Sequence, residues 1–250
     1  MGRPRPGLRL DRLAAAAAGL FFPPVCVACS RPPAAGAVLC DACREQTLFL
    51  TQDPCRRCGR PLGPGRAGRT CPECRDRPPA FDRARAVAVH AGPLAEALRR
   101  FKYHRRLSLG PRLAGLLAAG APDGLLDSAD LVAPVPLHPR RLARRGFNQA
   151  LILASGLKRP GGPRLVRDLL LRRRHTRPQV GLDPAQRRAN VAGAFGVNPK
   201  RAAVVESARV LLVDDVYTTG ATAGECARVL GASGAAGVDV LTLARAVEPA

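Results

Sequence analysis

Apolar and polar segments alternate in blocks along the last two thirds of the chain. Short apolar runs with the length of strands lie at 83–92, 129–137, 208–216 and 238–246. Segments with helical spacing separate them, at 93–103, 111–119, 140–158 and 222–230. The alternation predicts an α/β domain with a parallel sheet and helices on both faces. In such a sheet, ligands bind beyond the carboxyl ends of the strands.

The first part of the chain has a different pattern. Residues 26–76 are rich in turns, and Pro78-Pro79 stops regular structure before the first strand. We therefore expect an N-terminal arm at 1–25, a Cys-rich module at 26–76 and the α/β domain at 83–250. The apolar run Leu13–Phe22 is shorter than the roughly 20 residues that a membrane span needs. It predicts a helix that packs on the module, and no membrane span is expected.

One polar segment, 172–190, interrupts the α/β pattern. It is basic, punctuated by turn residues and without an apolar period. A segment of this length inside such a domain is more often a functional lid than a passive connection. A solvated surface loop is the alternative.

The charge of the chain is strongly positive. There are 40 basic and 19 acidic residues, for a net charge of +21, and all but three of the basic residues are arginine. Such a charge favours polyanions, either nucleic acid or phosphorylated small molecules. A general compositional bias toward Ala, Arg, Gly and Pro explains the arginines equally well.

Eight of the nine cysteines form four Cys-x-x-Cys pairs before residue 75. Tandem pairs of this kind suit tetrahedral zinc coordination better than disulfides, and they favour a reducing compartment, most simply the cytoplasm. We expect two structural zinc ions. Sequential halves are preferred over interleaved pairing, and the ligands are Cys26, Cys29, Cys40, Cys43, Cys55, Cys58, Cys71 and Cys74. The lone Cys226 is interpreted as a buried core residue.

The stretch VLLVDDVYTTGAT, at 210–222, places two adjacent carboxylates at the end of a buried strand. A nucleotide hydrolase would add a phosphate loop ending in lysine, and no lysine of the chain follows such a loop. A receiver domain would carry its acid pair on the first strand, whereas only 35 residues follow Asp215. Both classes are excluded, which leaves a binder of sugar phosphates.

The residues that follow the acids suit that class. Gly220 permits a tight turn, and backbone amides at the start of the next helix form a site for a phosphate monoester. The predicted phosphate-binding residues are Thr218, Thr219, Gly220, Ala221 and Thr222. Asp214 and Asp215 are placed to accept hydrogen bonds from the vicinal hydroxyls of a ribose. The segment resembles the 5-phosphoribosyl-1-pyrophosphate (PRPP) signature of type I phosphoribosyltransferases.

Further motifs extend the resemblance over nearly the whole chain. They are FKYHRRLSLGPRLAGLL at 101–117, PVPLHPRRLARRGFNQA at 134–150, RHTRPQVGLDPAQRRANVAGAF at 174–195 and the double Cys-rich ribbon. Together they resemble the ComF competence family of the ComFC/GntX type. The resemblance implies a double zinc ribbon joined to a type I phosphoribosyltransferase-like domain, with a role in DNA uptake and natural transformation.

The resemblance also implies roles for basic residues. The loop Leu137–Arg145 would hold pyrophosphate, the lid at 172–190 would close over it, and Mg²⁺ would bridge pyrophosphate and ribose near the acids. The residues concerned are Leu137, His138, Arg141, Arg145, Gln179 and Arg187. For His138, capping a helix is an equal alternative.

Two functions remain open at this stage. The first is a phosphoribosyltransferase that displaces pyrophosphate toward an acceptor that the sequence does not identify. The second is a non-catalytic zinc protein that binds single-stranded DNA on a phosphoribosyltransferase scaffold, with DNA-uptake proteins as further partners. Because aromatic residues make up only 4% of the chain, DNA binding would depend on phosphate contacts rather than on base stacking.

Overall fold

The computed structural model describes residues 25–50, 54–66, 68–103, 106–179 and 181–247. Its strands are β1 (Arg83–Val89), β2 (Leu131–Pro134), β3 (Arg164–Leu165), β4 (Leu170–Arg172), β5 (Phe195–Val197), β6 (Arg209–Tyr217) and β7 (Gly237–Arg245). Its α-helices are α2 (Asp41–Glu45), α3 (Pro72–Asp76), α4 (Gly92–Tyr103), α5 (Gly110–Ala119), α6 (Pro139–Arg145), α7 (Gln149–Ser155), α8 (Pro184–Val191) and α9 (Ala221–Ala232). Two 3₁₀ turns are η1 (Leu107–Leu109) and η2 (Pro199–Val204).

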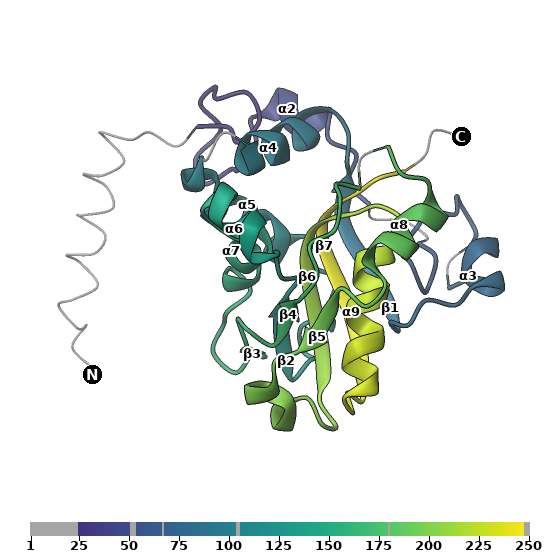
Figure 1. The fold of residues 1–250 in the computed structure, drawn as a ribbon. Coiled ribbons are helices and arrows are strands. Elements are labelled where there is room, and N and C mark those ends of the chain that lie inside the picture. Colours follow the sequence, from purple (N-terminus) through teal and green to yellow (C-terminus); the bar gives the residue numbers. More distant parts are fainter. Residues whose placement is uncertain (1–24, 51–53, 67, 104–105, 180, 248–250) are drawn as a thin grey trace, which may run out of the picture.

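Five strands form one sheet in the order β1-β7-β6-β2-β3, and every neighbouring pair is parallel. The two remaining strands, β4 and β5, form a separate antiparallel pair. The long strands β6 and β7 lie at the centre, where side chains are covered from both sides (Figure 1). The parallel α/β sheet expected from the alternating pattern is confirmed.

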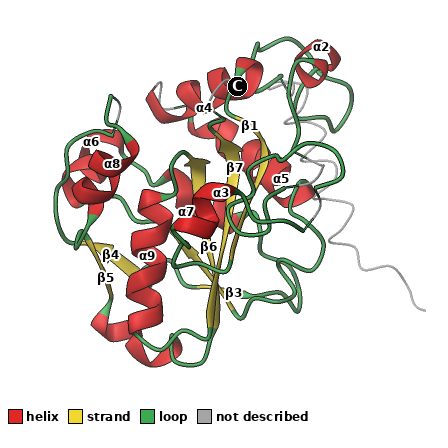
Figure 2. Ribbon diagram, turned by 90° about the vertical axis from the view of Figure 1, so that its right-hand side faces the viewer, coloured by secondary structure: helices red, strands yellow, loops and turns green. Residues whose placement is uncertain are grey.

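The alternation of side chains along β6 divides the core in two. Leu211 and Val213 pack with residues of α4, α5 and α7 on one face. Val210 and Leu212 pack with residues of α9 and of the β4–β5 pair on the other. Figure 2 shows the sheet between α9 and α5. A strand that is apolar at both sets of positions is therefore buried on both faces, as its sequence predicts.

Two local predictions need correction. The periodicity predicted one helix over 140–158 and the resemblance implied a loop at Leu137–Arg145, but the segment forms two short helices, α6 and α7. His138 and Pro139 begin α6, and Gly146, with a φ of 85°, ends it before Asn148 begins α7. Strand β6 also continues past the acid pair to Tyr217, because β7 keeps pairing with it as far as Arg245.

The Cys-rich module contacts the α/β domain at two separate places. The first ribbon is held by Arg100, which donates hydrogen bonds to the carbonyl of Ala28 (2.6 Å) and the hydroxyl of Ser30 (2.7 Å). The second ribbon reaches the start of β1, where the amide of Ala84 donates to the carbonyl of Arg57 at 2.6 Å. In Figure 1 their helices α2 and α3 lie at different ends of the molecule.

The segment between the ribbons covers an otherwise open strand. Leu50 donates its amide to Val87, and Val89 donates to Leu48, so residues 48–50 run antiparallel along the outer edge of β1. Covering an edge strand removes a template for aggregation. No helix within the described ranges is long and apolar enough to cross a membrane. The helix expected at Leu13–Phe22 lies outside the described residues.

Candidate functional site

Two clusters of four cysteines define the metal centres. Cys26, Cys29, Cys40 and Cys43 form the first, and Cys55, Cys58, Cys71 and Cys74 form the second, with the sulfur atoms of each cluster within 4.8 Å of one another. Sulfurs at the corners of a tetrahedron, 2.3 Å from a zinc ion, would be about 3.8 Å apart. The Sγ atoms of Cys29 and Cys40 are 3.6 Å apart, and those of Cys58 and Cys71 are 3.8 Å apart. The clusters fit two structural zinc ions, and the sequential pairing is confirmed.

The surroundings of the Cys29 and Cys55 sulfurs favour the thiolate form that zinc requires, whereas burial raises the pKa of the Cys43, Cys58 and Cys74 thiols. The guanidinium of Arg31 donates to Cys29 Sγ at 3.5 Å, and this hydrogen bond lowers the pKa of Cys29 to about 6. Burial opposes ionisation of Cys55, but backbone amides outweigh it, that of Cys71 foremost, and lower its pKa to about 6. Cys226 takes no part: it is fully buried in the core beneath α9, as predicted.

A cavity of about 640 Å³ lies at the carboxyl ends of β2 and β6. Its walls come from α4, from the segment after β2, from the segment between β4 and β5, and from the loop before α9. Of the predicted site residues, the following line it: Leu137, Arg141, Arg145, Gln179, Arg187, Asp214, Asp215, Thr218, Gly220, Ala221 and Thr222. Residues from four distant parts of the sequence are thus brought to one chamber.

The acid pair is exposed to this cavity because β2 is shorter than β6. Strand β2 ends at Pro134, which pairs with Val213, so Asp214 and Asp215 lie beyond the end of their neighbour. Asp215 is only 4% exposed, and its carboxylate forms an ion pair with the ammonium group of Lys102. A cation therefore already sits beside the carboxylates.

The two aspartates differ in charge state. Burial and the neighbouring Asp215 carboxylate raise the pKa of Asp214 well above its usual range. Burial also acts on Asp215, but the Lys102 ammonium outweighs it and lowers the pKa of Asp215. The pair consequently holds one negative charge balanced by Lys102 and one carboxyl group that retains its proton, and a cation bound there would displace this proton to solvent.

The Thr/Gly loop joins the acid pair to helix α9. Gly220 has a φ of 77° and directly precedes the first residue of the helix. Among the described residues, no side chain caps the backbone amides at this helix start. A side chain at position 220 would also lie 2.2 Å from the hydroxyl of Tyr217. Glycine is therefore required here both for conformation and for space, and the helix start remains open to an anion.

The predicted lid lies against this loop. Gln179 donates a hydrogen bond to the hydroxyl of Thr222 at 3.0 Å, and Arg141 donates to the carbonyl of Thr176 at 2.7 Å. The segment is not a plain loop, because Asp183 and Gln186 form a capping box that starts α8. Arg187, on that helix, donates to the carbonyl of Leu182 at 2.8 Å.

Two predicted residues lie elsewhere. The Nδ1 atom of His138 accepts the backbone amide of Arg140 at 3.2 Å, so this side chain caps α6 and does not line the cavity. Thr219 does not line this cavity but a second one, whereas Thr218 lines both.

Helix α4 contributes cavity residues that sequence reasoning missed. Lys102, Tyr103 and nearby His90 all line the chamber, and the guanidinium of Arg145 lies 5.6 Å above the Tyr103 ring. Burial and the positive charge of Lys102 lower the pKa of His90. The available signal was a lysine in a chain whose basic residues are almost all arginine.

Two cysteine ribbons joined to a parallel α/β domain, with an acid pair and a Thr/Gly loop lining one cavity, define a double zinc ribbon α/β protein. The family model of the double zinc ribbon domain matches residues 17–75. Together with its relatives, this shows that the chain belongs to the ComF competence family.

The relatives cover most of the chain. The chain is 33% identical over 232 residues to the DNA utilization protein YhgH of Escherichia coli K12. The match covers 90% of this chain and 99% of that protein. It is 32% identical to Competence protein F of Haemophilus influenzae, over 83% of this chain and 90% of that protein. Competence protein ComFC of Bacillus subtilis is 29% identical, over 83% and 84% of the two chains.

Proposed function

We propose that the 640 Å³ cavity binds PRPP and that the protein is a phosphoribosyltransferase-like member of its family. The observation that carries the proposal is the meeting of an acid pair, an uncapped helix start and two arginines in one chamber. These groups match the three parts of PRPP: a ribose with vicinal hydroxyls, a terminal phosphate and a pyrophosphate.

Each part of the ligand has a natural position. Asp214 and Asp215 would hold the ribose hydroxyls, and residues 218 and 220–222 would hold the 5-phosphate. Arg141 and Arg145, with the backbone after Leu137, would hold the pyrophosphate. Thr219 and His138 are no longer assigned to the ligand, because neither lines this cavity.

The proposed chemistry is displacement of pyrophosphate at the anomeric carbon. The two arginines would balance the negative charge of the leaving pyrophosphate. The segment that carries Gln179 would exclude water from the positive charge that develops at the anomeric carbon. A bound Mg²⁺ would supply further charge to the pyrophosphate, and the carboxyl groups of Asp214 and Asp215 have the oxygen ligands that it prefers. The acceptor is unassigned.

The test is calorimetric titration of PRPP with Mg²⁺ into the zinc-loaded protein and into Asp214→Asn/Asp215→Asn. We expect the double variant to bind at least about tenfold more weakly, because each lost charged hydrogen bond costs about 1.5–3 kcal/mol. Asp123→Asn, an exposed aspartate outside the cavity, is the matched control and should bind as the wild type does. Equal binding by all three proteins, or binding by none, would refute the proposal.

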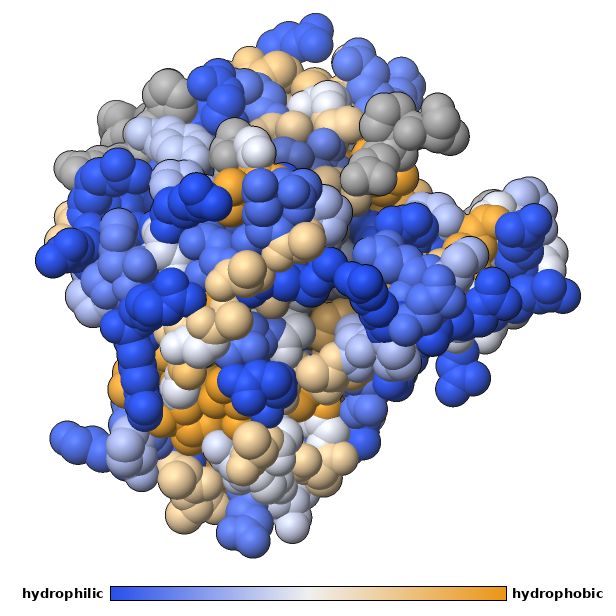
Figure 3. Space-filling model, turned by 45° about the vertical axis from the view of Figure 1, so that its right-hand side comes forward, coloured by the Kyte–Doolittle hydropathy of each residue, from blue (hydrophilic) through white to orange (hydrophobic). Residues whose placement is uncertain are grey.

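We also propose that the protein acts on DNA during uptake or use. Two kinds of observation support this role. The relatives carry the names competence protein and DNA utilization protein, and the chain has a net charge of +21. Figure 3 shows a face on which hydrophilic side chains predominate. Because few aromatic side chains are available for stacking, phosphate contacts would supply the affinity for a single strand.

The measurement is fluorescence anisotropy with a labelled single-stranded oligonucleotide over a series of KCl concentrations. We expect log affinity to fall linearly with log salt, with a slope of about −0.7 for each phosphate contacted. Asp214→Asn/Asp215→Asn should retain this binding, because the acid pair repels rather than attracts phosphates. An affinity that does not change with salt would exclude direct DNA binding through the arginines.

A further inference from the structure

A second cavity, of about 970 Å³, lies on the other side of the Thr/Gly loop. Its walls are the second ribbon, the segment 77–81, helix α8, the start of α9 and the end of β7. It shares Arg187 and residues 217, 218, 220 and 221 with the first cavity, so the loop and the Arg187 side chain separate the two chambers. None of the roles proposed above uses this space.

The rim of the second cavity carries excess positive charge. Two of its arginines are paired with its two glutamates: Arg60 with Glu73 at 2.8 Å, and Arg228 with Glu225 at 2.7 Å. The side chains of Arg77 and Arg188 also line it, and neither has a partner among the described residues. The rim is therefore suited to an anion.

Two residues that line the same cavity each have a buried polar atom without a hydrogen-bond partner within the described part of the chain. These atoms are Nε of Arg245 and the hydroxyl oxygen of Thr219. Arg245 is only 5% exposed. Its other nitrogens reach the carbonyl and the sulfur of Cys58, and its guanidinium lies 4.4 Å above the ring of Tyr217.

Buried unpaired donors of this kind are rare, because each costs about 1–3 kcal/mol. Phosphate oxygens satisfy such donors well, since they form strong charge-assisted hydrogen bonds with a guanidinium N–H. A phosphate group also has enough acceptor oxygens to engage the rim arginines and a hydroxyl together. These groups therefore indicate phosphate rather than a small neutral ligand.

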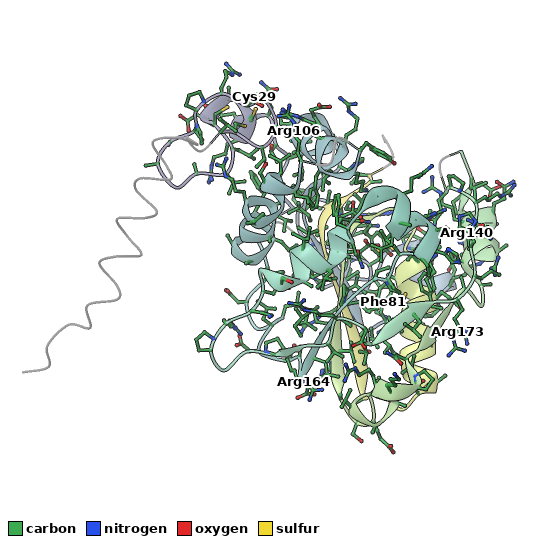
Figure 4. The ribbon with its side chains drawn as sticks, turned by 60° about the vertical axis from the view of Figure 1, so that its left-hand side comes forward. Cys29, Phe81, Arg106, Arg140, Arg164 and Arg173 are labelled. Carbon is green, nitrogen blue, oxygen red and sulfur yellow. The ribbon has the colours of Figure 1, made fainter. Side chains whose placement is uncertain are left out.

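Part of the wall is apolar. Pro78, Pro79, Phe81 and Val191 line it, and Phe81 is fixed by an edge contact with Tyr217 at 6.2 Å between ring centroids. Figure 4 shows Phe81 near the centre of the molecule. A ligand that fills the space thus carries an apolar body as well as its charged end. We propose that this cavity binds a phosphate ester with an apolar or planar body, of the size of a nucleoside monophosphate.

The experiment uses adenosine monophosphate (AMP) as the probe and the full zinc-loaded chain as the receptor. The background is Asp214→Asn/Asp215→Asn, because both residues line only the first cavity. In this background Arg77→Ala/Arg188→Ala should weaken AMP binding at least about tenfold, as expected for the loss of charged phosphate contacts. Adenosine and inorganic phosphate, titrated separately, should each bind more weakly than AMP.

The control is Arg164→Ala, which removes one positive charge from a surface remote from this cavity. Arg164 is exposed on β3 and lies at the lower end of the molecule in Figure 4. It should leave AMP binding unchanged. Equal affinities for the Arg77/Arg188 and Arg164 variants would overturn the proposal.

A crystal structure of the wild-type protein with AMP provides the independent measurement. Phosphate density beside Arg188 and Thr219 is the expected result, and AMP found only beside Asp214 would overturn the proposal. Because these outcomes concern residues that the first cavity does not use, a failure of PRPP to bind would leave them unaffected.

Discussion

The contact between Lys102 and Asp215 is the most consequential single interaction at the proposed site. The side chains are 20% and 6% exposed, so the pair is largely withdrawn from water. Lys102→Met would leave a buried carboxylate without its cation. We expect this variant to lose about 3 kcal/mol of unfolding free energy at neutral pH, as for other broken buried ion pairs. Urea denaturation measures the loss.

The pH dependence of that loss has a definite sign. In the wild type, the lowered pKa of Asp215 contributes stability above the usual aspartate pKa, and this is lost as pH falls through the lowered value. Without Lys102, burial raises the pKa of Asp215, and protonation relieves the unpaired charge at a higher pH. The difference between the two proteins should therefore shrink on acidification. Lys102→Met/Asp215→Asn should recover most of the stability, and a loss unchanged from pH 7 to pH 4 would contradict the assignment.

At this same scale, sequence reasoning was strongest where residues are adjacent. The acid pair and the Thr/Gly loop form one continuous segment, so their proximity follows from chain connectivity alone. Lys102 could not be found in this way, because 112 residues separate it from Asp214 and only the packing of α4 brings them together. Thr219 lines only the second cavity, and no periodicity in the sequence reveals which cavity a turn residue lines.

At the scale of elements, periodicity predicted the long helices and strands well. The strands at 83–89, 209–217 and 237–245 and the helices at 92–103, 110–119 and 221–232 lie within a few residues of expectation. The short strands β3, β4 and β5 were missed, because two or three residues carry no measurable alternation. Their pairing is decided by tertiary contacts rather than by local pattern.

Helix α8 and the break between α6 and α7 were missed although the chain carries the signals of both. Pro139 follows the capping residue His138 at the start of α6, and Gly146 ends that helix in a left-handed conformation. Asp183-Pro184 and Gln186 likewise form the capping box of α8 inside the predicted lid. In both segments the density of arginines suggested a turn or a loop. Capping residues are therefore better evidence of helix boundaries here than polarity is.

At the scale of the whole molecule, the two ribbons have separate structural partners. Sulfurs of the first ribbon lie in the core cluster that includes α4, and sulfurs of the second lie in the cluster that includes Phe81 and Tyr217. Cysteine spacing predicted both metal sites, but it contains no information on which part of the α/β domain each would support. In the structure, the first ribbon packs with helix α4, which carries Lys102. The second ribbon packs with residues at the two ends of the Thr/Gly loop.

This arrangement predicts different effects for the loss of each zinc. Cys43→Ser and Cys74→Ser should each reduce bound zinc from two ions to one, measured by metal analysis of the purified protein. Cys74→Ser should weaken PRPP and AMP binding together, because Arg245 links Cys58 to Tyr217 at the partition between both cavities. Cys43→Ser acts through α4, so it should weaken PRPP binding. AMP binding in the Asp214→Asn/Asp215→Asn background should be retained.

Cys226→Ala is the matched control for these variants, since it removes a buried cysteine that belongs to neither cluster. It should retain two zinc ions and bind both PRPP and AMP as before. Its free energy of unfolding should fall by only about 1 kcal/mol, as a small core truncation causes. If Cys43→Ser and Cys74→Ser changed the affinities for PRPP and AMP to the same degree, the ribbons would stabilise the domain as one unit. The separate couplings inferred from the two core clusters would then be wrong, because a zinc ion that supports only its own neighbourhood cannot alter the distant chamber to the same degree.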